Sequence, residues 1–162
     1  MRRVILAIAF AAVAAPAGAG PLKPAQLDCA VVKAPPGLAD KLAAGIVAEN
    51  YRALQPLRQQ LGNLIGQCVR LHRMTDAQGE AYEDYAMARL PHGSLQRQLA
   101  KAGLPMPRID AALARLGDSP AQLLEDAGFT EAKLGSATWA RLQAYGDLAQ
   151  RLAKYRAALL QA

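Results

Sequence analysis

The sequence predicts an all-α protein: a single-domain, irregular helical bundle with a long C-terminal amphipathic helix, short central helices and an irregular N-terminal lead-in. Alanine and leucine, both strong helix formers, dominate a chain in which only 5% of residues are aromatic. From Leu38 onward, apolar residues recur at spacings of three and four, the period of a helix with one buried face. Hydrophobic residues are 52% and charged residues 20% of 162, which describes one globular domain rather than a disordered chain.

The first 19 residues are typical of an export signal. Arg2 and Arg3 precede an apolar run over residues 4–15, and a small-x-small pattern ends at Ala19. As a helix, that apolar run would span roughly 18 Å, too short for a bilayer core of about 30 Å. We therefore expect cleavage after Ala19 and a periplasmic or secreted mature protein without a stable membrane span.

The charge pattern argues against nucleic acid as a partner. Loss of Arg2 and Arg3 with the leader lowers the formal net charge from +6 to +4. The remaining basic residues are spread along the chain and form no long run. The expected partner is another envelope protein or a second copy of the chain.

Residues 20–37 form a lead-in that is rich in proline and glycine. We expect it to be extended or irregular, apart from the short segment 27–33, which has the apolar content to pack locally. The two cysteines, Cys29 and Cys68, predict one structural disulfide in an exported chain. Closing that loop would stabilise the fold by about 4 kcal/mol in the chain-entropy model and tie the lead-in to the middle of a helix.

The helical domain is expected to cover residues 38–162. Its first apolar stripe runs over residues 38–54 and a second over residues 57–72. Pro56 between them is expected either to kink one helix or to start the next.

A third helix is predicted over residues 76–90. Thr75 and Gln78 have the spacing of a capping box at its start. The turn-forming run 91–93, Pro-His-Gly, is expected to stop it, and Ser94 is expected to cap a further short helix.

Two more short helices and one long helix complete the prediction. The short ones are expected within residues 104–117 and 119–128, the second with Ser119 and Gln122 in another capping box. The long helix, over residues 136–160, carries an apolar stripe at three-four spacing with basic residues on the other faces. That stripe consists of Trp139, Leu142, Tyr145, Leu148, Leu152, Tyr155 and Leu159.

The most distinctive candidate for binding chemistry is a polar and aromatic face near residue 80. Four carboxylates at three-four spacing form an acidic stripe on one helix, and two tyrosines and an arginine lie close by in sequence. The set consists of Asp76, Glu80, Glu83, Asp84, Tyr82, Tyr85 and Arg89. Such a face could bind a cation, a basic partner or a sugar, or it could be a solvated acidic surface with half-buried tyrosines.

The only histidines, His72 and His92, are weak candidates for a metal site. They fall at opposite ends of the predicted third helix, roughly 22 Å apart, and no His-x-x-x-His or Glu-x-x-His pair exists. The simpler expectation is a helix C-terminal residue for His72 and a turn residue for His92.

These observations favour a non-enzymatic binding or accessory module that contacts another envelope component, and no cofactor is expected. Ser94, Ser119 and Ser136 are explained by capping, and no nucleophile–base motif is present in the sequence. The alternative is a metal-binding or small-ligand-binding protein that uses the acidic stripe 76–84 with His72 or His92. An enzyme would require a cleft that combines carboxylates with tyrosines.

Overall fold

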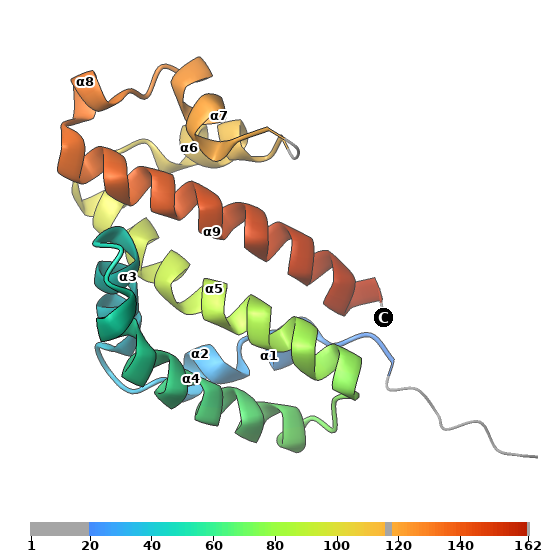
Figure 1. The fold of residues 1–162 in the computed structure, drawn as a ribbon. Helices are drawn as coiled ribbons and strands as arrows, with labels where there is room; N and C mark the ends of the chain where they lie inside the picture. The colour runs from blue at the N-terminus through green and yellow to red at the C-terminus, as the bar shows by residue number, and fades with distance from the viewer. Residues whose placement is uncertain (1–19, 116–117, 162) are drawn as a thin grey trace, which may run out of the picture.

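The computed structural model describes residues 20–115 and 118–161, and this part of the chain contains nine helices and no strand, which confirms the all-α class (Figure 1). The helices are α1 (Pro24–Leu27), α2 (Cys29–Lys33), α3 (Leu38–Val47), α4 (Tyr51–Leu71), α5 (Asp76–Lys101), α6 (Met106–Leu113), α7 (Pro120–Asp126), α8 (Glu131–Leu134) and α9 (Ser136–Gln161). The predicted leader, residues 1–19, lies outside the described residues. None of the described helices is both long and apolar enough to cross a bilayer.

Two helices of 26 residues, α5 and α9, form the centre of the fold. They run antiparallel along most of their length, with α3 and α4 on the side of α5 and α6, α7 and α8 packed on the first half of α9 (Figure 1). The core divides into two clusters. One joins α1–α4 to the first half of α5 and the end of α9, and the other joins the second half of α5 to α3, α6, α7 and the start of α9.

The lead-in is anchored to the bundle by hydrogen bonds and by the disulfide. The Leu22 amide donates to the Leu159 carbonyl at the end of α9, 3.1 Å away. Cys29 is bonded to Cys68 with their Cα atoms 6.0 Å apart, which confirms the predicted disulfide. Tyr82 accepts a 3.0 Å hydrogen bond from the amide of Ala30. The segment predicted to pack locally therefore does so, as the short helix α2, and the disulfide ties it to the last turn of α4 rather than to its middle.

The first break between long helices lies before Pro56 and not at this proline, where the sequence predicts it. α3 ends at Val47 and α4 begins at Tyr51, capped by the Asn50 side chain, which accepts from the Ala53 amide. Pro56 lies inside α4 and neither ends nor starts a helix. The turn is made instead at Glu49, whose φ of 50° is left-handed.

The predicted stop at residues 91–93 is wrong, because α5 continues through it to Lys101. The capping box of Thr75 and Gln78 at its start is present. Pro91 removes one helical hydrogen bond, at a cost of about 3 kcal/mol. Pro91 is also fully buried and Leu90 nearly so, and burial of that apolar surface offsets this cost. Ser94 is consequently a mid-helix residue and caps nothing.

The remaining helices pack on the first half of α9. Gly146 of α9 is a close-approach point, since a Cβ there would lie 2.8 Å from Pro120 of α7 and 3.2 Å from Leu113 of α6. Ser119 occupies the N-cap of α7, but its side chain makes no capping hydrogen bond, so the second predicted capping box is not formed. The long C-terminal helix is confirmed as α9.

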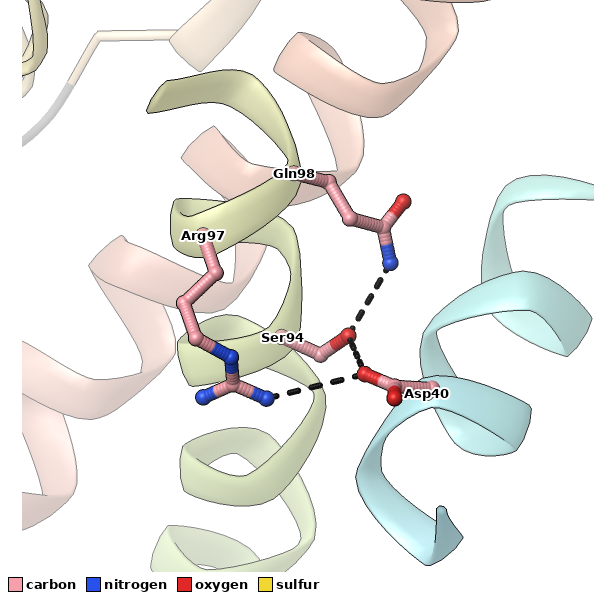
Figure 2. A network of polar contacts seen from close by, with 4 residues as sticks. All are labelled: Asp40, Ser94, Arg97 and Gln98. Carbon is pink, nitrogen blue, oxygen red and sulfur yellow. Dashed lines mark hydrogen bonds and ion pairs between the residues drawn. The ribbon is translucent and has the colours of Figure 1, made fainter. Parts of the chain in front are cut away.

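A small polar network joins α3 to α5 where the predicted turn would have been (Figure 2). The Ser94 hydroxyl, which is 0% exposed, donates to Asp40 at 2.5 Å and accepts from the Gln98 amide at 3.0 Å. Arg97 lies 3.5 Å from the same Asp40 oxygen, but both of these side chains are largely exposed. The buried hydroxyl is thus fully bonded, and the exposed ion pair should contribute little.

This network predicts an unequal double-mutant cycle. Ser94→Ala should lower the free energy of unfolding by about 1.5 kcal/mol, because it removes a hydrogen bond to a charged group. Most of that loss should disappear in an Asp40→Ala background, whereas Arg97→Ala should cost less than about 0.5 kcal/mol. Urea denaturation of the single and double variants measures each value. Additive effects of Ser94→Ala and Asp40→Ala would contradict the assignment.

Candidate functional site

Two clefts flank the α5–α9 pair, one on each side. The first, which we call the acidic cleft, has a volume of about 650 Å³ and lies between α3, α4, α5 and α9. Its charged lining consists of Glu49, Arg58, Glu83, Asp84, Asp147 and Arg151. The second, which we call the histidine cleft, has a volume of about 570 Å³ and lies between α1, α5, α6 and α9. Its polar lining includes Asp28, Tyr85, Arg89, His92, Asp110, Tyr145 and Arg156.

The residues predicted to form one binding face are divided between these clefts. Glu83 and Asp84 line the acidic cleft, while Tyr85 and Arg89 line the histidine cleft. Asp76, Glu80 and Tyr82 line neither cleft. Successive residues of a helix turn by about 100°, so α5 presents different chemistry to its two sides.

Both tyrosines of the predicted face belong to the hydrophobic core. Tyr82 is 0% exposed and Tyr85 is also buried, not half-buried as expected. Burial raises the pKa of both phenols, and the nearby Arg89 opposes this for Tyr85. Both tyrosines therefore stay protonated at neutral pH, and Tyr82 serves to hold the lead-in through Ala30.

The acidic stripe and the histidines do not converge. His72 is the C-cap residue of α4, as expected, and His92 lies in the middle of α5. Within residues 20–115 and 118–161, no group of three or more His, Cys, Asp or Glu side chains is placed to hold a metal ion.

His92 differs most from its predicted role. Its ring stacks on that of Tyr145 across the α5–α9 contact, with centroids 4.3 Å apart and planes at 22°. Its Nδ1 is buried and has no hydrogen-bond partner among the described residues. Desolvation by burial, together with the positive charge of Arg89, lowers the pKa of His92 to about 4, although Asp110 acts in the opposite direction. The imidazole is neutral at physiological pH.

The Tyr145 ring of this stack is held in place by Asp110 of α6. The Tyr145 hydroxyl donates to Asp110, 2.6 Å away, and burial and this contact both raise the pKa of Tyr145. Further along the histidine cleft, Arg89 forms an ion pair with Asp28, with 3.6 Å between Nε and Oδ1. Both carboxylates of the lining are therefore engaged by the protein itself.

The acidic cleft has an apolar floor beneath its charges. Leu42, Leu54 and Leu148 are buried side chains of that floor. At the far end, a hydrogen bond with Asp84 raises the pKa of Tyr155, and partial desolvation raises the pKa of Asp147 against the effect of Arg151. Tyr51 lies at the rim and is 71% exposed.

Sequence reasoning missed Asp110, Tyr145 and Asp147 as site residues, and it placed His92 in a turn. The sequence does contain a signal that His92 lies within a helix. The three-four spacing of buried residues continues through the proline without interruption: Gln78, Tyr82, Tyr85, Ala88, Pro91, Leu95 and Leu99. The Tyr145–Asp110 contact joins positions 35 residues apart, and no local pattern encodes it.

Comparisons with known proteins add no family to this description. Neither protein-family models, nor curated proteins, nor solved structures give a match to the chain. The site has to be interpreted from its own geometry.

The depressed pKa of His92 predicts a pH-dependent stability. An unfolded histidine titrates near 6.5 and the folded one near 4, so between these values the unfolded chain binds more protons. The contribution is complete above about pH 6.5 and is lost as the pH falls toward 4. Relative to a His92→Phe variant, which keeps a stacked ring, the natural protein should lose stability through this window. Urea denaturation at several pH values measures the difference, and parallel stability curves would contradict it.

Proposed function

We propose that this protein is an exported, non-enzymatic binding module, and that its acidic cleft receives a basic, partly apolar segment of another envelope protein. The observation that carries the proposal is the lining of that cleft. Four carboxylates and two guanidinium groups surround an apolar floor, an acidic excess on a chain whose formal net charge is +6. A cationic segment with apolar side chains matches both properties.

The rim of the cleft supports a protein partner. Tyr51 begins α4 and leaves most of its surface exposed beside Glu49. Exposed tyrosines are enriched at protein interfaces, because the ring is apolar and rigid while the hydroxyl remains able to hydrogen-bond. Leu54, one turn further along α4, continues the apolar surface into the floor of the cleft.

A binding role is favoured over catalysis by the state of the reactive side chains. Ser94 is bonded to Asp40 and Gln98, while His92, two residues away, contacts Tyr145 on α9. The histidine therefore cannot act as a base for that serine. Export is supported by the residue pattern of the first 19 positions and by the Cys29–Cys68 disulfide, a bond that persists in oxidising compartments.

Site-specific photo-crosslinking in a bacterial host tests this proposal. A photoreactive residue in place of Tyr51, in the full chain with its own leader, should yield an adduct in the periplasmic or secreted fraction. Mass spectrometry should locate the crosslink in a partner segment that carries lysine or arginine among apolar residues. The same probe at Gln67, an exposed position of α4 outside the cleft, should not capture this partner.

Charge reversal provides the matched comparison. Glu49→Lys with Glu83→Lys should reduce the adduct about tenfold or more, because like charges then face each other across the contact. Glu80→Lys with Glu125→Lys makes the same change in net charge at exposed positions outside both clefts, and should leave the adduct unchanged. An adduct that survives reversal in the cleft, or that forms only in the cytoplasm, would contradict the proposal.

A further inference from the structure

We propose that the histidine cleft is a second, separate site, and that it binds a small organic carboxylate with an apolar body. Neither the partner nor the chemistry of the acidic cleft enters this inference. It rests on the shape of the histidine cleft, on the charge that its lining leaves unpaired and on an unsatisfied polar atom at its wall.

The cleft has the size and the mixed lining of a small-ligand site. Its volume of about 570 Å³ falls within the range of roughly 300–1,000 Å³ that is usual for such sites. Leu27, Leu113 and Leu152, from three different helices, provide apolar walls. The stacked rings of His92 and Tyr145 also contribute to the lining.

The charges of the lining favour an anion. Asp28 is paired with Arg89, and Asp110 accepts the hydroxyl of Tyr145, so each carboxylate already has a partner. Arg156, by contrast, forms no ion pair with any residue of the described chain. The 3.6 Å contact of Arg89 with Asp28 involves its Nε, which leaves other guanidinium donors for a ligand. A carboxylate is an anion whose two oxygens match the forked donors of a guanidinium group.

His92 supplies an independent indication of a ligand. Folded proteins rarely leave a buried polar atom without a hydrogen bond, because its desolvation is then uncompensated. Nδ1 of His92 is such an atom, on a residue that lines the cleft beside Arg89 and Asp110. A neutral imidazole carries one N–H donor and one acceptor, so a small shift of the ring would let it bond to a carboxylate or hydroxyl oxygen.

The binding experiment uses two acids of this class and an uncharged analogue. Decanoate and 3-phenylpropionate are titrated into the mature protein by calorimetry, and decanamide serves as the neutral match for decanoate. We expect at least one acid to bind saturably, and the amide to bind about tenfold more weakly or worse, since it lacks the charge that the arginines recognise. Preference between the two acids distinguishes a linear from an aromatic ligand.

Two variants of α9 assign the site. Arg156→Gln should weaken binding of the acid about tenfold, through the loss of a charge-assisted contact. Arg151→Gln removes the same charge from the same helix but lines the acidic cleft, so it should bind the acid as the natural protein does. Thermal unfolding of each variant verifies that it is folded.

The outcomes are decisive in both directions. Binding that requires the carboxylate and Arg156, and not Arg151, establishes the site. Equal binding of acid and amide, equal effects of the two substitutions, or no binding of either acid to the folded protein would overturn the proposal. None of these results depends on whether a protein partner occupies the acidic cleft.

Discussion

The antiparallel contact between α5 and α9 is the interaction on which the rest of this structure depends. Both hydrophobic clusters include residues from the two helices, and each of the other helices packs against one or both of them or against a helix that does. At the middle of the contact, His92 lies flat on Tyr145, and Asp110 of α6 holds the tyrosine hydroxyl. The lead-in is fastened at the far end, where Leu22 bonds to Leu159 and Tyr82 to Ala30.

The same contact produces the two clefts. Flanking helices cover the α5–α9 pair incompletely, and a groove remains on each side where side chains of both helices reach solvent. The buried contact between the two helices separates the charges on its two sides. Carboxylates predominate on the side of α3 and α4. On the side of α1 and α6, the carboxylates have partners, whereas Arg156 forms no ion pair with another described residue. One pair of helices can thereby present two surfaces of different charge. We propose a basic segment for the first and an organic acid for the second.

Local signals predicted much of the fold. The capping box of Thr75 and Gln78 marks the start of α5, the three-four stripe from Trp139 to Leu159 predicts α9, and two cysteines in an exported-type chain predict the disulfide. Pro91 was misinterpreted because a proline in a helix costs a fixed local amount, whereas the burial that offsets it depends on neighbours distant in sequence. The candidate site was harder to predict for the same reason: Tyr145, Asp110 and Asp28 reach His92 and Arg89 only through tertiary packing.

The continuity of α5 through Pro91 is the central claim, since a break there would separate His92 from Tyr145 and remove a wall from each cleft. Backbone NMR assignment tests it most directly. The account predicts helical Cα chemical shifts without interruption from residue 76 to residue 101, apart from a local perturbation at the proline, together with NOEs between the rings of His92 and Tyr145. Non-helical shifts over residues 91–93, with no contact between these two rings, would show that the local turn signal prevails and would contradict the account.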